Sequence, residues 1–411
     1  MKNKPIQQNL TIDEANNKKT RSVLLGAAFL MATSSIGPGF LTQTTVFTQQ
    51  LASSFAFVIL ISLILDVFAQ LNIWRIIGLS GLRGQEIANK VLPGLGIVLS
   101  ICIVVGGLAF NIGNIAGTGL GLNAMIGINP IAGSIISAII AIMIFVIKEA
   151  GKVMDKVTQI AGFMMIILMF YVAIKTQPPV GEALINTVKP AEIDMFAIVT
   201  LVGGTVGGYI TFAGGHRLLD AGIKGPNALP QITQSSVTGI VATGIMRVLL
   251  FLAVLGVVSQ GLAIDPDNPA ASVFQLAAGN IGYRIFCVIM WAAAITSVVG
   301  AAYTSVSFIK TFHPLIEKYH NYVIILFIVI SSSTFAFVGQ PVTVLILAGA
   351  LNALILPLAL GTILIGAYRK DVVGENYKQP LWLTIPGALV VVSMGYMAII
   401  TLMKEIPKLF S

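Results

Sequence analysis

The chain has 411 residues, of which 56% are hydrophobic and only 10% are charged, and its formal net charge is +8. A soluble protein carries about 25% charged residues and cannot bury so large an apolar fraction, so the composition indicates an all-α polytopic membrane protein in a lipid bilayer. The two cysteines, Cys102 and Cys287, exclude a disulfide scaffold. We read the excess of basic residues as a topology signal, and we expect no nucleic-acid partner.

Residues 1–21 are polar and lack the early apolar core of a signal peptide, so they are predicted to form a disordered cytoplasmic arm. Eleven apolar stretches follow, each of a length suited to a membrane helix. They cover residues 23–47, 54–79, 95–121, 130–148, 156–175, 195–220, 233–261, 277–309, 322–338, 341–367 and 381–403.

The connecting segments can be tested by counting lysine and arginine. With the N-terminus inside, the inner segments hold 18 of these residues and the outer segments hold 4, at Lys175, Lys189, Lys404 and Lys408. Cytoplasmic loops are enriched in lysine and arginine. The sequence therefore predicts a multi-pass protein of the plasma membrane with a cytoplasmic N-terminus and an external C-terminus.

Two of the stretches carry helix-breaking residues near their centres. The first contains Gly37, Pro38, Gly39 and Phe40, and the sixth contains Gly203, Gly204, Gly207, Gly208 and Tyr209. One interpretation of the sixth stretch is close helix packing through small residues. However, stretches one and six begin two successive sets of five, and interrupted helices in matching positions indicate the binding site of a secondary transporter.

At this point the sequence resembles the NRAMP family of divalent-metal transporters. The resemblance is carried by Leu25, Gly26, Phe29 and Pro38-Gly39, by 119–123 with Gly127-Ile128, by 203–206, and by Leu356-Pro357. It implies a LeuT-like fold with eleven transmembrane helices. Helices 1–5 (residues 22–175) and 6–10 (195–367) would form inverted repeats with helices 1 and 6 broken, and 380–411 would hold the eleventh helix and the C-terminus. The family imports manganese or iron with protons.

The chain departs from the family at the positions implied to bind metal. The family's helix 1 Asp and Asn fall on Gly37 and Phe40, and its Met-Pro-His motif falls on Gly207, Gly208 and Tyr209. Two glutamines fall on Gly349 and Ile355, and an acidic pair falls on Asn111 and Asn114. We therefore expect a divergent bacterial-type branch that lacks the metal-binding motifs and has no metal site.

The altered positions suggest a different cargo. Half-helix N-termini suit an anionic group, and Phe40 and Tyr209 offer an apolar wall and a hydroxyl. The predicted substrate-binding residues are Gly37, Pro38, Gly39, Phe40, Gly203, Gly207, Gly208 and Tyr209, and the predicted cargo is an organic acid or an amino-acid-like solute. Polar groups just beyond the first predicted break would add to this pocket, at Thr42, Gln43, Thr44 and Thr45. The alternatives are core packing for Phe40 and Tyr209 and a solvated half-helix for the four polar residues. A reorganised divalent-cation site and a non-transporting sensor also stay open.

Ionisable and amide side chains inside the stretches are candidates for the pathway or for coupling to H⁺ or Na⁺. They are Asp66, Asn111, Asn114, Arg247 and Asn352. A structural ion pair between Asp66 and Arg247 is the alternative to a transport role. The sequence contains no P-loop, zinc-spacing cluster or nucleophile motif, so we expect neither an enzyme nor a cofactor.

Overall fold

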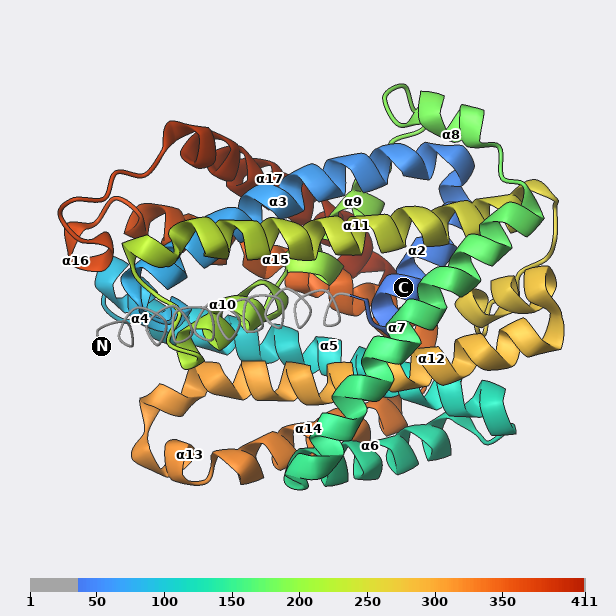
Figure 1. Cartoon of the computed structure of the whole chain (residues 1–411), viewed down its shortest axis with the longest axis horizontal. Helices are drawn as coiled ribbons and strands as arrows, with labels where there is room; N and C mark the ends of the chain where they lie inside the picture. Colours follow the sequence, from blue (N-terminus) through green and yellow to red (C-terminus); the bar gives the residue numbers. More distant parts are fainter. Residues whose placement is uncertain (1–35, 410–411) are drawn as a thin grey trace, which may run out of the picture.

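The computed structural model describes residues 36–409, except for the side chains of 148–159, 311, 402 and 404–409. The predicted arm and the first part of stretch 23–47 lie outside the described residues. The described chain is built from helices (Figure 1). The long ones are α2 (Pro38–Leu51), α3 (Phe55–Ser80), α5 (Leu95–Ile126), α6 (Pro130–Val146), α7 (Lys148–Thr176), α9 (Met195–Val206), α10 (Ile210–Asp220), α11 (Leu229–Ser259), α12 (Pro269–Ile309), α14 (His320–Val338), α15 (Pro341–Gly366) and α17 (Leu381–Leu409).

The apolar stretches predicted from residue 54 onward lie largely on these helices. Within the described residues, eight segments are long and apolar enough to cross a membrane, or nine if the bent pair Ile160–Thr176 and Val180–Asn186 forms one span. The predicted start at 277 is wrong for α12, which begins at Pro269. A kink at Gly279, with φ of +65°, divides this helix close to the predicted start.

The broken segment Met195–Asp220 forms the centre of the molecule, with 89% of its most apolar window buried. α9 packs against α15, α3 and α2, and α10 packs against α3 and α12. Around this centre α3 runs alongside α11, while α5 runs alongside α12 on the other side (Figure 1). The broken segment is thereby shielded from lipid, as non-helical backbone at membrane depth requires.

Short helices cover the two ends of the bundle. α4 (Gly84–Val91), α13 (Pro314–Lys318) and α16 (Lys370–Val373) lie at the left end in Figure 1, whereas α8 (Val180–Asn186) lies toward the other end. A hydrogen bond from Lys90 to the Asp371 carbonyl, 2.7 Å long, joins α4 to α16. The two ends therefore have separate sets of polar contacts.

Candidate functional site

The first element of the site is the N-terminus of α2. Gly37 has an extended conformation and caps the helix, Pro38 occupies its first turn, and the Leu41 N–H donates to the Gly37 carbonyl over 3.2 Å. The first-turn N–H groups of an α-helix lack partners within the helix, and Pro38 removes one of them. A buried helix N-terminus with free N–H groups therefore starts at Gly37.

The second element is the interruption between α9 and α10. α9 ends at Val206, Gly207 is extended, Gly208 has φ of +53°, and α10 starts again at Ile210. Only glycine adopts this left-handed conformation readily. A Cβ at position 208 would also collide with the Asn352 Oδ1 atom. The break thus depends on glycine for its backbone angle and for space.

Polar side chains connect the start of α2 with the break between α9 and α10. A Cβ on Gly37 would lie 3.2 Å from the Ser297 Oγ atom and 3.3 Å from the Asn114 Oδ1 atom. The Asn114 amide in turn lies beside the Tyr209 hydroxyl, and both side chains are buried. Neither group makes a hydrogen bond of good geometry within the described chain. Buried polar atoms normally have partners, so this cluster has the capacity to bind a polar ligand.

Two further amides line the same region. The Asn352 Nδ2 atom donates to the carbonyls of Gly106 and Ala348, and this holds its Oδ1 atom toward Gly208. Gln43 donates to the Leu345 carbonyl over 2.9 Å, while its Oε1 atom lies against Gly204. Both amide oxygens lack a partner among the described groups. Amide oxygens therefore face the broken helix from α15 and from α2.

The glycines of α9 serve mainly to bring helices together. A Cβ on Gly203 would collide with the Gly349 carbonyl oxygen of α15. Gly207 is equally confined, because its Cβ would collide with the Gly203 carbonyl oxygen. For Gly203, the packing interpretation of the sequence agrees with these contacts.

Arg247 brings a buried positive charge to this region. Its side chain is 1% exposed, its Nη2 atom donates to the Thr205 Oγ1 atom over 2.7 Å, and its Cζ atom lies 4.7 Å from the centre of the Phe40 ring. Thr205 precedes the break after α9, and Phe40 lies in the first turn of α2. The Nε and Nη1 atoms of Arg247 have no partner within the described chain. A guanidinium is therefore available beside the start of α2 and beside the break after α9.

Asp66 is buried on α3 near the same guanidinium. Arg247 acts on it electrostatically, and the Thr205 hydroxyl lies within reach of its carboxyl group. Among the residues that the structure describes, Asp66 has no ion pair within 4.0 Å. Asp66 and Arg247 are thus close without forming the tight pair that sequence reasoning allowed.

Other candidates from the sequence have different surroundings. Asn111 donates to the Ser331 Oγ atom of α14 over 3.0 Å, away from the Asn114–Tyr209 cluster. The Thr42–Thr45 segment is buried, so the solvated alternative for it is wrong. The predicted set omitted Gln43, Ser297 and Thr205. A buried glutamine within an apolar stretch was the available signal, but the contacts of Ser297 and Thr205 depend on distant helices.

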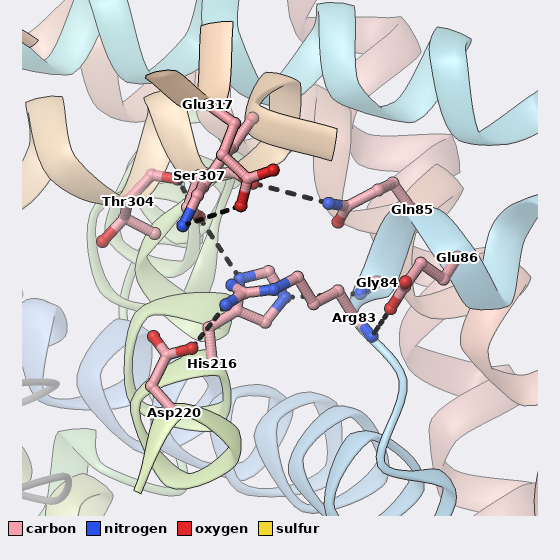
Figure 2. Close-up of polar contacts among 10 residues, drawn as sticks. Arg83, Gly84, Gln85, Glu86, His216, Asp220, Thr304, Ser307 and Glu317 are labelled. Carbon is pink, nitrogen blue, oxygen red and sulfur yellow. Dashed lines mark hydrogen bonds and ion pairs between the residues drawn. The ribbon is translucent and has the colours of Figure 1, made fainter. Parts of the chain in front are cut away.

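A separate polar cluster closes the end of the bundle that carries α4 (Figure 2). Arg83 forms an ion pair with Asp220 at the end of α10, and its backbone N–H donates to Glu86 over 2.6 Å. The His216 Nε2 atom accepts from the Gly84 N–H over 3.3 Å, and its Nδ1 atom lies 3.5 Å from the Ser307 Oγ atom of α12. These contacts tie α10 to α4 and α12.

The side chains beside the start of α2 and the break after α9 are amides, hydroxyls and one guanidinium. No group of three or more His, Cys, Asp or Glu side chains is placed to hold a metal ion in the described part of the chain. Gly37 and Gly207 supply no side-chain ligand at the breaks, and the nearby Arg247 repels a cation. Amides, hydroxyls and a guanidinium can hydrogen-bond to anionic or neutral polar groups.

Comparison with known families identifies the chain. The sequence profile of the Natural resistance-associated macrophage protein-like (Nramp) family matches residues 28–404. The chain belongs to the Nramp family. It is therefore a transporter-family protein and not an enzyme.

Two relatives of this Nramp chain are described only as uncharacterized membrane proteins. YcsG of Bacillus subtilis (strain 168) is 68% identical over 390 residues, which cover 95% of this chain and 96% of YcsG. A Haemophilus influenzae protein is 56% identical over 391 residues, covering 95% of this chain and 98% of the relative. Both support a multi-pass membrane protein.

Solved structures support a LeuT-like fold for this Nramp chain. A single-residue mutant of the Eremococcus coleocola manganese transporter gives a TM-score of 0.74 at 15% identity, covering 96% of this chain and 88% of that one. The structure of MhsT in complex with L-phenylalanine gives a TM-score of 0.68 at 17% identity, and the match covers 92% of this chain and 97% of MhsT. One fold thus accommodates a manganese transporter and a protein that binds an amino acid.

Proposed function

We propose that this Nramp-family chain is a secondary transporter that imports a small organic acid or an amino-acid-like solute, driven by an ion gradient, rather than a transition metal. The observation that carries the proposal is the composition of the site between the two helix breaks. Asn114, Tyr209 and Asn352 present unpartnered amide and hydroxyl atoms there, and Arg247 presents unpartnered N–H groups within the described chain.

The expected binding mode follows from these groups. A carboxylate of the solute would accept hydrogen bonds from the Arg247 guanidinium and from the free N–H groups at the start of α2. The Asn114 amide and the Tyr209 hydroxyl would bind the polar remainder, and the Phe40 ring would limit its size. The fold that this chain shares with MhsT, which was solved with L-phenylalanine, is consistent with a solute of this class.

The proposal includes a topology. Eleven transmembrane helices would form inverted repeats over residues 22–175 and 195–367, with 380–411 carrying the eleventh helix. The N-terminus would be cytoplasmic, the C-terminus external, and the protein would reside in the plasma membrane. The lysine and arginine bias supports this orientation.

Import of manganese, iron or magnesium through a reorganised site is the second candidate. It is favoured by family membership and by the fold shared with a manganese transporter. Magnesium keeps several of its waters and needs few protein ligands. However, the buried charge beside the breaks includes Arg247, and this positive charge disfavours a divalent cation.

Uptake into proteoliposomes distinguishes the two candidates. We expect saturable uptake of at least one labelled solute among lactate, succinate, alanine and glutamate, and no saturable uptake of manganese. Asn114→Ala should lower the uptake, whereas the matched variant Asn111→Ala should retain it, because Asn111 faces α14. Robust manganese uptake, with no uptake of the organic solutes, would overturn the proposal.

A further inference from the structure

The structure holds one buried carboxyl group that the proposed solute site does not use. Asp66 is 0% exposed, and it is the only buried Asp or Glu among the residues whose burial is described. Neither of its oxygens has a hydrogen-bonded partner of good geometry in that part of the chain. An unpaired carboxylate is costly to bury, so its charge depends strongly on the groups beside it.

The charged surroundings of Asp66 are sparse. Of the elements packed against α3, α11 brings the Arg247 guanidinium and α9 brings the Thr205 hydroxyl. The sequences of α2, α9 and α15 contain no titratable residue, and α11 contains only Arg247. On α3 itself, Arg75 lies further along the helix and donates to Thr233.

The remaining packed elements carry their ionisable residues elsewhere. These residues lie toward helix ends, in short helices at the ends of the bundle, or on α17, where Tyr396 is exposed. They are His216, Arg217 and Asp220 on α10, Glu182 on α8, Lys370 and Asp371 on α16, and Tyr396, Lys404, Glu405 and Lys408 on α17. Arg247 is therefore the charged group that acts on Asp66.

Arg247 has two possible partners in this arrangement. In the structure it donates to Thr205 and covers the Phe40 ring, and Asp66 is left without an ion pair among the described side chains. A negative charge on Asp66 would attract the guanidinium away from Thr205 and Phe40. These two residues lie at the break after α9 and at the start of α2, so the charge of Asp66 can influence the solute site through Arg247.

We propose that Asp66 is the proton-carrying group that couples solute movement to the proton gradient in this transporter. The inference rests on the proposed function. A proton from the outer solution first binds a carboxylate oxygen of Asp66. Arg247 then stays with Thr205 and Phe40 and can bind the solute carboxylate. After the solute is released, the proton leaves Asp66 for the inner solution. Asn111 and Asn114 carry amides, which do not titrate, so they cannot take this role.

Infrared spectroscopy tests the proton site without any solute. The purified full chain should show the C=O band of a protonated carboxyl group in apolar surroundings, and this band should weaken as the pH is raised. Asp66→Asn should remove the band, whereas Asp267→Asn, at an exposed loop position, should leave it unchanged. A band that is absent, that does not change with pH, or that survives Asp66→Asn would overturn the inference.

Transport tests the coupling. Proteoliposomes loaded with a pH-sensitive dye should acidify as wild type takes up an accepted solute from the panel of lactate, succinate, alanine and glutamate. Asp66→Asn should keep solute exchange but lose both the acidification and the gradient-driven accumulation, and Asp66→Glu should restore them. If wild type takes up a solute and Asp66→Asn still couples it to protons, the inference fails. If wild type takes up no solute, the proposed function fails, and the infrared experiment still decides whether Asp66 binds the proton.

Discussion

At the scale of single residues, the site is defined by side chains that are small or absent. Gly208 has a left-handed backbone, and the amide oxygen of Asn352 occupies the space where a Cβ would stand. The Asn352 amide cannot turn away without losing its bonds to the carbonyls of Gly106 and Ala348. The glycine and the asparagine therefore depend on each other.

Gly208→Ala should destabilise the protein more than Gly222→Ala does. Both residues have positive φ, and an alanine in this conformation lowers the free energy of unfolding by about 1–2 kcal/mol. Position 222 has nothing within 4 Å of the added Cβ, whereas position 208 adds a clash of about 1–3 kcal/mol. Thermal unfolding in detergent should rank wild type above Gly222→Ala and Gly222→Ala above Gly208→Ala. Equal loss in the two variants would show that Asn352 adapts freely.

The hydroxyl of Thr205 is a second residue-scale test. Thr205→Val keeps the shape of the side chain but leaves the Arg247 Nη2 donor without its acceptor, which should cost about 1.5–3 kcal/mol. Thr205→Ser retains the hydroxyl and serves as the matched control. Thermal unfolding of the purified variants measures the difference. Similar stability of the valine and serine variants would mean that the guanidinium finds another acceptor.

At the scale of elements, α10 is connected to α4 and α12 at one end and to the broken backbone at the other. The Arg83–Asp220 pair and the His216 contacts hold the first connection (Figure 2). The Trp74 indole donates to the Thr211 carbonyl over 2.7 Å and fixes the other end of α10 to α3. Movement of α10 therefore requires the polar cluster at α4 to open.

Arg83→Gln should make this end of the bundle open more readily. Glutamine removes the ion pair with Asp220 but keeps the hydrogen bond that the backbone N–H of residue 83 donates to Glu86. The reporter is a cysteine introduced as Ser307→Cys in a chain that also carries Cys102→Ser and Cys287→Ser. A maleimide should label this cysteine about two- to fivefold faster in Arg83→Gln, which corresponds to the loss of a partly exposed ion pair.

Arg369→Gln is the control for this experiment. It removes the exposed pair with Asp371 and the hydrogen bond to the Val91 carbonyl of α4, but no contact with α10. The hydrogen bond from Arg369 lowers the pKa of the Asp371 carboxyl in the wild type. The labelling rate should stay at the wild-type value. If the two variants accelerate labelling equally, the effect comes from general loosening and not from the Arg83–Asp220 contact.

At the scale of the whole molecule, apolar length in the sequence predicted eleven spans, and the described residues contain eight segments long and apolar enough to cross a membrane, or nine with the bent pair. Composition located every described helix from α3 to α17 that exceeds 18 residues, Gly207-Gly208 located the break after α9, and Pro38 located the start of α2. Contacts between distant helices were not predictable in this way. Asn111 and Asn114 are three residues apart and neighbours on α5, yet one meets Ser331 of α14 and the other meets Tyr209 at the break after α9.

The two ends of the molecule differ in charge, and this leads to a prediction about its orientation. At one end, Arg83, Lys90 and Arg369 join α4, α10 and α16 through polar contacts. At the other end, the Ser53 hydroxyl donates to Glu182, and Asp194 caps α9. Lysine and arginine concentrate on the cytoplasmic side of a membrane. We expect the end with α4 and α16 to face the cytoplasm.

Reporter fusions at two positions measure this orientation. Alkaline phosphatase folds only outside the cytoplasm and green fluorescent protein is fluorescent inside it. A fusion after Gly374, at the end of α16, should be fluorescent and lack phosphatase activity. A fusion after Thr187, at the end of α8, should show the opposite, because it lies at the end where Glu182 and Asp194 gather. The reverse pattern would place the basic end outside, and the proposed direction of proton and solute entry would then have to be inverted.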